Sequence, residues 1–233
     1  MKHSALLILL YLGAAAGVFA AESAEHRFAV VHGHTLRDCR GTLVIGPTGI
    51  RFEAGRESDT RAWNWTDIRE LRVESPRELS LVTYEDQKRL LGRDRVFHFR
   101  LIDGDITPAL AQELAAWAAR PPVLAVLPPE SSPPLFQIPV KHRHLTGGCV
   151  GELRVYAEHL EFRSTELPTH NRFWRWSDLA AFSQPERFLW LIHTFAAGED
   201  TLTFDLRQDA PVGAADNLRD RLVEAALPAV VGD

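Results

Sequence analysis

The sequence contains the same pattern of residues twice, and this internal duplication constrains the fold more than any other feature. The repeated positions are a His-x-His pair, a Cys-x-Gly segment and a Trp-x-Trp-x-Asp segment. In the first copy they are His32, His34, Cys39, Gly41 and Trp63 to Asp67, and in the second copy His142, His144, Cys149, Gly151 and Trp174 to Asp178. The offset is 110 residues at the histidines and 111 residues at the tryptophans. The chain therefore contains two copies of one small domain.

The N-terminus has the pattern of an export signal. Lys2 and His3 form a short basic start, residues 5–19 are a continuous apolar run, and Ala20 ends a segment that suits signal peptidase. The apolar run is shorter than the ~20 residues that a transmembrane helix needs. We therefore expect residues 1–20 to be a signal peptide that is cleaved after Ala20, with an uncleaved N-terminal anchor as the alternative. The expected location is periplasmic or secreted.

The charge balance argues against nucleic acid as a partner. The chain has 26 Lys and Arg residues against 31 Asp and Glu residues, which gives a formal net charge of −5. Nucleic acids and anionic membranes select basic surfaces. The expected partner is therefore a protein or another component of the cell envelope.

Prolines mark the boundary between the two copies. Three Pro-Pro pairs lie within residues 121–134. Proline lacks a backbone donor and has a fixed φ, so this segment cannot form a central strand or the interior of a helix. We expect a stiff, extended connector of the polyproline type. This places the first domain at 26–120, the linker at 121–134 and the second domain at 135–228.

Apolar residues alternate with polar residues through much of each copy, which is typical of half-buried strands. One strand of the second copy has Phe136, Ile138, Val140, His142 and His144 on one face. Further strands are expected at 50–54, 62–65, 79–84 and 95–101, and at 160–163, 173–176, 188–193 and 201–206. A helical spacing of apolar residues ends each copy, and the polar segment 85–94 is expected to be a solvated hairpin loop. The pattern predicts a mainly β fold of two tandem small β-barrels, each closed by a C-terminal α-helix.

Several segments of the first copy carry a resemblance to a known superfold. They are Gly41 to Ile45, Gly49 to Phe52, Trp65 to Ile68, Leu79 to Thr83, Phe97 to Phe99 and Trp117 in the closing helix. In these segments the chain resembles tandem PH-like domains, especially their GRAM-type and bacterial relatives. The second copy departs at the aligned helix position, where Arg221 stands.

The best-known activity that this resemblance implies is phosphoinositide binding. That activity needs a cluster of Lys and Arg around the first hairpin, which would satisfy several phosphates. The first hairpin offers Arg37 and Arg40 with Asp38 between them. We therefore do not expect phosphoinositide binding.

The repeated histidines and cysteine are the main candidate site. Two histidines that are two residues apart on a strand project from the same face, and a hairpin returns the cysteine toward them. Two imidazoles and a thiolate form a partial ligand shell for zinc or copper. A fourth ligand is missing from the motif, so water, a carboxylate or a partner would have to supply it. The hypothetical metal ligands are His32, His34, Cys39, His142, His144 and Cys149.

A structural cluster is the simpler interpretation of these residues. His142 and His144 continue the apolar face of their strand, and a buried cysteine behaves as a small hydrophobic residue. Two cysteines in an exported chain also permit a disulfide, although their matching positions favour two separate thiols.

The Trp-x-Trp-x-Asp segments are interpreted as a folding signature. In that interpretation, at least one indole is buried and Asp67 or Asp178 caps the following turn.

The sequence contains no recognisable catalytic motif, so we expect no catalytic residues and no resident cofactor. The leading hypothesis is an exported, non-enzymatic binding or interaction module of the bacterial envelope, built from two PH-like repeats. The alternative is a periplasmic protein that binds Zn or Cu through the repeated His-x-His-x4-Cys set. That alternative predicts about two metal ions per chain, and an affinity that falls as the histidines protonate below about pH 6.

Overall fold

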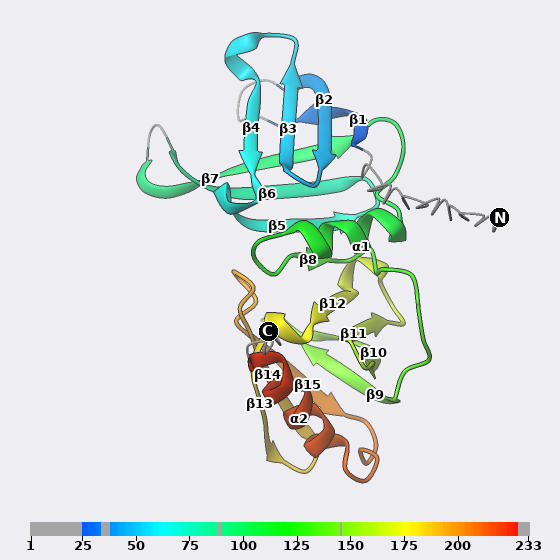
Figure 1. Ribbon diagram of the computed structural model, residues 1–233. Coiled ribbons are helices and arrows are strands. Elements are labelled where there is room, and N and C mark those ends of the chain that lie inside the picture. The colour runs from blue at the N-terminus through cyan, green and yellow to red at the C-terminus, as the bar shows by residue number, and fades with distance from the viewer. Residues whose placement is uncertain (1–24, 34–37, 88–89, 145, 228–233) are drawn as a thin grey trace, which may run out of the picture.

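The computed structural model describes residues 25–33, 38–87, 90–144 and 146–227, which form two open β-sheets and two α-helices (Figure 1). The first sheet has eight strands in the order β4-β3-β2-β1-β7-β6-β5-β8, and the second has seven in the order β12-β11-β10-β9-β15-β14-β13. We call the first sheet with α1 the first domain, and the second sheet with α2 the second domain. The expectation of a mainly β fold is confirmed.

The first domain is built as an antiparallel meander with a helix packed against it. Its elements are β1 (His26–His32), β2 (Cys39–Gly46), β3 (Gly49–Ala54), η1 (Glu57–Asp59), β4 (Arg61–Asn64), η2 (Trp65–Asp67), β5 (Ile68–Ser75), β6 (Glu78–Gln87), β7 (Leu90–Leu101), α1 (Pro108–Trp117) and β8 (Val123–Leu124). The side chain of Thr107 caps α1 by accepting a hydrogen bond from the backbone N–H of Leu110. The helix buries Leu110 and Leu114 in the core of this domain.

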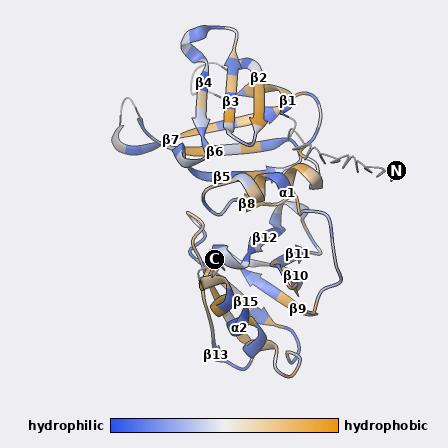
Figure 2. Cartoon of the chain, viewed as in Figure 1, coloured by the Kyte–Doolittle hydropathy of each residue, from blue (hydrophilic) through white to orange (hydrophobic). Residues whose placement is uncertain are grey.

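The second domain repeats the order of elements from β1 to α1, as the duplication in the sequence predicts, and has no counterpart of β8 among its described residues. Its elements are β9 (Phe136–Arg143), β10 (Gly148–Val155), β11 (His159–Ser164), η3 (Pro168–His170), β12 (Arg172–Arg175), η4 (Trp176–Asp178), β13 (Leu179–Glu186), β14 (Leu189–Thr194), β15 (Thr201–Leu206) and α2 (Ala214–Ala226). Each sheet has its own apolar core, and the apolar residues of the strands are seen in orange in Figure 2.

The expectation of closed barrels was wrong, because neither sheet closes. In each domain the fourth and fifth strands form no ladder with one another. The chain turns the corner between them as a short 3-10 helix, η2 or η4. A capping box satisfies the backbone groups at this corner: the Asp67 carboxylate accepts from Asn64 N at 3.0 Å, and the Asp178 carboxylate accepts from Arg175 N at 2.9 Å. With its polar groups satisfied locally, the corner needs no partner strand.

The Trp-x-Trp-x-Asp segments are a folding signature, as the sequence predicted. All four indoles are buried, and both aspartates are caps; the indoles belong to Trp63, Trp65, Trp174 and Trp176. The second tryptophan of each pair begins the 3-10 helix and does not continue the strand. Its indole N–H still reaches backbone oxygens, Gly46 O at 3.1 Å from Trp65 and Ala157 O at 2.9 Å from Trp176.

Two further expectations were wrong in detail. The polar segment 85–94 is part of a hairpin, as predicted, but the strands β6 and β7 extend into it, with Asp86 paired to Asp94. This segment has no regular alternation of apolar and polar residues, so the sequence pattern did not reveal the strands. The strands β5 and β13 were also missed.

Part of the expected linker belongs to the first sheet. Val123 and Leu124 form β8, which pairs in parallel with β5 at the edge of the sheet. Val123, Leu124 and Ala125 are buried there. An edge is where a proline-rich segment can pair, since no central ladder is interrupted. The domain bounds at 26–120 and 135–228 stay a prediction.

The expected signal peptide, residues 1–20, lies outside the described residues. Among the helices that the structure describes, none has both the length and the apolar character needed to cross a bilayer.

Candidate metal centre

His142, His144 and Cys149 come together at one end of the second sheet. His142 is the partner of Cys149 in the antiparallel ladder between β9 and β10. His144 follows β9 directly, and its backbone N–H donates to Gly147 O at 3.1 Å, which closes the hairpin. The potential ligand atoms of the three side chains all lie within 4.8 Å of one another. The structure therefore brings the three predicted residues of the second copy into one cluster.

The cluster is partly closed to solvent. His142 and Cys149 are buried, and His144 is half-buried. His144 Nε2 lies 3.0 Å from Cys149 Sγ, and the centres of the two imidazole rings are 4.6 Å apart. The alternation of apolar and polar residues predicted that these side chains lie at the end of the core, and the burial of His142 and Cys149 agrees with that prediction.

His142 has a nitrogen without a partner. Its ring stacks on Phe204 at 4.9 Å between centroids and meets Phe162 edge-on at 5.3 Å. Among the described residues, no group hydrogen-bonds the buried Nδ1 atom. A buried polar atom in this state costs about 1–3 kcal/mol, which a ligand would recover.

The histidines of the cluster are held in the neutral form. Burial, with the neighbouring His144, lowers the pKa of His142 to about 3. Burial, with the neighbouring His170, also lowers the pKa of His144. A neutral imidazole is the form that binds metal. The loss of affinity that an ordinary imidazole would show below about pH 6 is therefore expected at lower pH here.

The Cys149 thiol is held in the protonated form. Burial raises its pKa, and the Glu166 carboxylate raises it further, while Arg172 opposes both effects. A metal ion would have to displace the thiol proton, because the thiolate is the ligand.

A third histidine, which the sequence analysis missed, lies beside the cluster. His170 ends η3, and its ring centre is 5.0 Å from that of His144. Its Nδ1 atom is buried and has no hydrogen-bond partner among the described residues. The duplication held a signal for it, because the equivalent residue of the first copy is Asp59, which ends η1. Burial raises the pKa of Cys39, and the Asp59 carboxylate raises it further. Each copy therefore has a metal-compatible side chain at the end of this 3-10 helix.

The first copy is described only in part. His32 is buried against Phe99, at 4.9 Å between ring centroids, and its Nδ1 atom lies 3.0 Å from His98 O. Cys39 is its ladder partner and is half-buried. His34 lies outside the described residues, so metal binding by His32, His34 and Cys39 stays a prediction.

Cys39 and Cys149 lie in different sheets, and no disulfide joins them. The prediction of two separate thiols is confirmed, and the alternative prediction of a disulfide was wrong.

An ion-pair network joins this site to the first domain. Arg172, whose charge helps to lower the pKa of both His142 and His144, pairs with Glu199 at 2.9 Å. Glu199 also lies 3.7 Å from Arg72 of β5 in the first domain. The candidate metal centre is therefore next to the domain interface.

We expect the metal-free protein to lose stability as the pH falls below ~6.5, because His142 then protonates in the unfolded chain and not in the folded one. The folded pKa lies below the unfolded value, so the unfolded state takes up the proton first. The cost is about 1.4 kcal/mol for each pH unit, or about 2 kcal/mol between pH 6.5 and pH 5. Urea unfolding in a chelator at pH 7 and pH 5 measures it. The His142→Phe variant is the matched control, and an equal loss in both proteins would contradict the prediction.

Comparisons with known proteins identify no family. No family model and no curated protein matches the sequence. The C-terminal domain of an unknown protein from Leishmania infantum is 14% identical, with a TM-score of 0.32, over 39% of this chain and 84% of that chain. The Spt16D Pob3N heterodimer is 14% identical, with a TM-score of 0.28, over 76% of this chain and 86% of that chain.

Proposed function

We propose that this chain is a non-enzymatic binding protein whose second domain holds one transition metal ion, Zn²⁺ or Cu⁺. The ligands are His142, His144 and Cys149. The observation that carries the proposal is the convergence of two imidazoles and one thiol within 4.8 Å. This combination of nitrogen and sulfur ligands suits zinc and copper.

The distances require only a small adjustment. Ligand atoms around a tetrahedral zinc ion lie roughly 3.5 Å apart, given bond lengths of about 2.0–2.3 Å. His144 Nε2 and Cys149 Sγ are already 3.0 Å apart. His142 is the most distant of the three ligands. Rotation of the His144 and Cys149 side chains would bring their ligand atoms closer to His142 and complete the set.

The setting favours a site that holds the ion over one that activates water. Catalytic zinc sites keep an open coordination position, whereas closed sites with four protein ligands retain the metal. His170 lies next to His144 and has an unpaired buried nitrogen, so it is the natural fourth ligand. This arrangement agrees with the lack of a catalytic motif in the sequence.

We also propose that each domain is PH-like and that the protein acts in the bacterial envelope. The shared order of strands followed by one helix supports the first part. The basic and apolar pattern of residues 1–20 supports the second. The partner in the envelope stays unnamed, and the interaction hypothesis stays a prediction.

The test is a metal count on the full mature chain, purified without an affinity tag and under reducing conditions. We expect stoichiometric zinc or copper bound to the second domain, and the Cys39→Ser variant should keep that ion. A free-thiol count on the same sample should show Cys149 protected from alkylation until a chelator is added. Metal-free protein that takes up neither ion, with Cys149 equally reactive with and without chelator, would contradict the proposal.

A further inference from the structure

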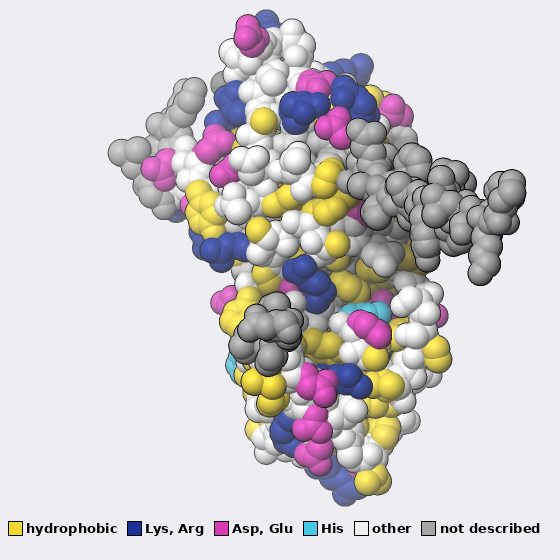
Figure 3. All heavy atoms as spheres, viewed as in Figure 1, with side chains coloured by type: hydrophobic (Ala, Val, Ile, Leu, Met, Phe, Trp, Pro, Cys, Tyr) yellow, Lys and Arg dark blue, Asp and Glu magenta, His cyan; other side chains and the backbone are white. Residues whose placement is uncertain are grey.

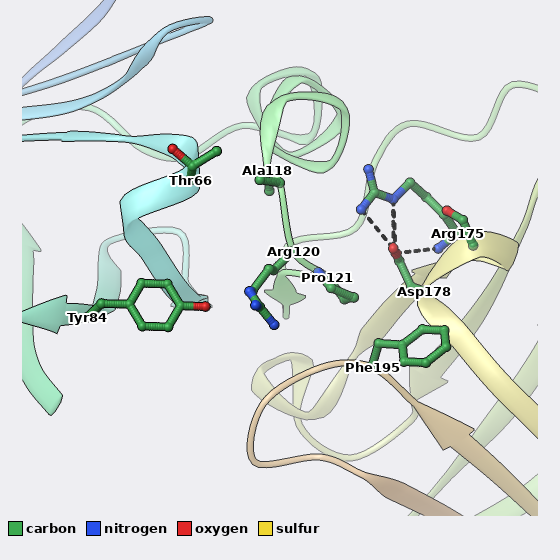
Figure 4. Close-up of a pocket in the computed structure, with 10 residues that line it drawn as sticks. Thr66, Tyr84, Ala118, Arg120, Pro121, Arg175, Asp178 and Phe195 are labelled. Atoms are coloured by element: carbon green, nitrogen blue, oxygen red, sulfur yellow. Dashed lines mark hydrogen bonds and ion pairs between the residues drawn. The ribbon is translucent and has the colours of Figure 1, made fainter. Parts of the chain in front are cut away.

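A cleft of about 710 Å³ lies between the two domains, away from the metal ligands. Figure 3 shows hydrophobic and basic side chains side by side where the molecule narrows between the domains. Figure 4 shows the cleft itself, lined from the first domain by Thr66, Tyr84 and Arg120 and from the second by Arg175, Ser177 and Phe195. Its volume falls within the range of about 300–1,000 Å³ that is typical of small-molecule sites.

The two domains supply equivalent residues to this cleft. Thr66 and Ser177 are the middle residues of η2 and η4. Tyr84 and Phe195 each follow a threonine that pairs with the first residue of the preceding strand. Thr83 pairs with Ile68 of β5, and Thr194 pairs with Leu179 of β13. The two sides of the cleft are therefore formed by equivalent positions of the two copies, and each copy contributes one aromatic ring.

Both aromatic rings are exposed. Tyr84 is 50% exposed and Phe195 is 61% exposed. Leaving a large ring in water forgoes the free energy that its burial would contribute. The two copies have diverged from one another at this position and have nevertheless both kept an exposed aromatic residue facing the same cleft. Packing does not explain this pair, whereas contact with a ligand does.

Arg120 supplies a positive charge between the two rings. Its guanidinium carbon lies 5.7 Å from the centre of the Tyr84 ring. Within the part of the chain that the structure describes, it forms no ion pair and no side-chain hydrogen bond. Figure 4 shows its side chain extending into the space between Tyr84 and Phe195.

The carboxylate that lines the cleft does not neutralise Arg120. Asp178 is bound by Arg175, with Nη2 at 2.7 Å from Oδ1, and it also caps η4. Its side chain is 3% exposed. The cleft therefore presents one uncompensated guanidinium, whose fork of N–H donors matches the geometry of a carboxylate.

We propose that this interdomain cleft binds an organic anion in which a carboxylate stands next to a flat apolar ring. Arg120 donates hydrogen bonds to the carboxylate, and the exposed rings of Tyr84 and Phe195 supply aromatic surface for the ring of the ligand. Because both domains line the site, a bound anion would also hold the two domains in one orientation. The proposal does not depend on the metal centre.

The test is isothermal titration of the full mature chain with phenylacetate, benzoate and indole-3-acetate, each compared with its neutral amide. We expect at least one acid to bind, and its amide to bind at least ~10-fold more weakly, since the amide lacks the charge that Arg120 recognises. The Arg120→Gln variant should lose about 10-fold in affinity for that acid, and the Phe195→Ala variant about 5-fold.

Arg187→Gln is the matched control. Arg187 also lies over an aromatic ring, 5.2 Å from the centre of Phe188, but it is far from the cleft and pairs with Asp209. This variant should bind the acid as the wild type does. The proposal is overturned if all three acids fail to bind at millimolar concentration, if acid and amide bind equally, or if the two arginine variants behave alike.

Discussion

The Cys149→Ser variant should bind Cu⁺ or Zn²⁺ at least ~100-fold more weakly than the wild type, because the site loses its only sulfur ligand. A serine hydroxyl occupies nearly the same space but does not ionise near neutral pH, so it cannot replace the thiolate. Competition with a chromogenic chelator, under anaerobic reducing conditions, measures the two affinities. Circular dichroism of the variant checks that the second domain is folded, and Cys149→Ala provides a second variant without a polar atom at this buried position.

Cys39→Ser is the matched control for this experiment, since it makes the same chemical change in the equivalent position of the first copy. It should leave the metal affinity of the second domain unchanged.

The His170→Ala variant should bind the metal ion about 10–100-fold more weakly than the wild type if His170 is the fourth ligand. His193→Ala is its control, because the half-buried His193 contacts Thr201, with Nδ1 at 3.0 Å from Oγ1, and is not one of the clustered residues. Wild-type affinity in Cys149→Ser would rule out the proposed centre.

The Phe173→Ala variant should destabilise the protein by about 3–4 kcal/mol and should uncouple the two domains. Phe173 belongs to β12 of the second domain, yet its side chain is 7% exposed and packs in the core of the first domain. The equivalent residue of the first copy is Ala62, which cannot make this contact. A side chain from one domain that fills the core of the other links their unfolding, so the wild type should unfold in one transition.

Urea unfolding, followed by tryptophan fluorescence and by circular dichroism, measures this effect. We expect the variant to show two transitions, or two probes that no longer coincide. Phe182→Ala is the control, since Phe182 packs against Trp190 within the second domain, at 5.1 Å between ring centroids. It should lower stability without splitting the transition. A single, coincident transition in Phe173→Ala would show that the interface does not depend on this ring.

Local patterns predicted much of the fold correctly. The duplication predicted two domains with the same order of elements, and period-two alternation predicted most of the strands. It also predicted that His142 and Cys149 lie at the end of the core. The missed strand β13 and the end of the long β6–β7 hairpin have no regular apolar alternation. The missed strand β5 alternates only over 71–74, after an irregularity between Ile68 and Glu70.

The candidate site was predictable only to the extent that its residues are neighbours in the chain. His142, His144 and Cys149 belong to one hairpin, and the spacing of a strand is sufficient to place them together. His170 comes from a 3-10 helix that no periodic pattern marks, and it reaches His144 only because η3 folds back across the end of the sheet. Comparing it with Asp59 in the first copy would have pointed to this position.

By itself, the sequence determined the duplication, the mainly β class and the inward direction of His142 and Cys149. Only the tertiary structure decided that the sheets stay open, that His170 lies beside His144, and that Arg120 stands between Tyr84 and Phe195. The physical reason is the range of the interactions. Alternation and spacing act between residues that are close in the chain, whereas the domain interface is set by the packing of Phe173 and by ion pairs such as Arg72 with Glu199, whose partners are far apart in sequence.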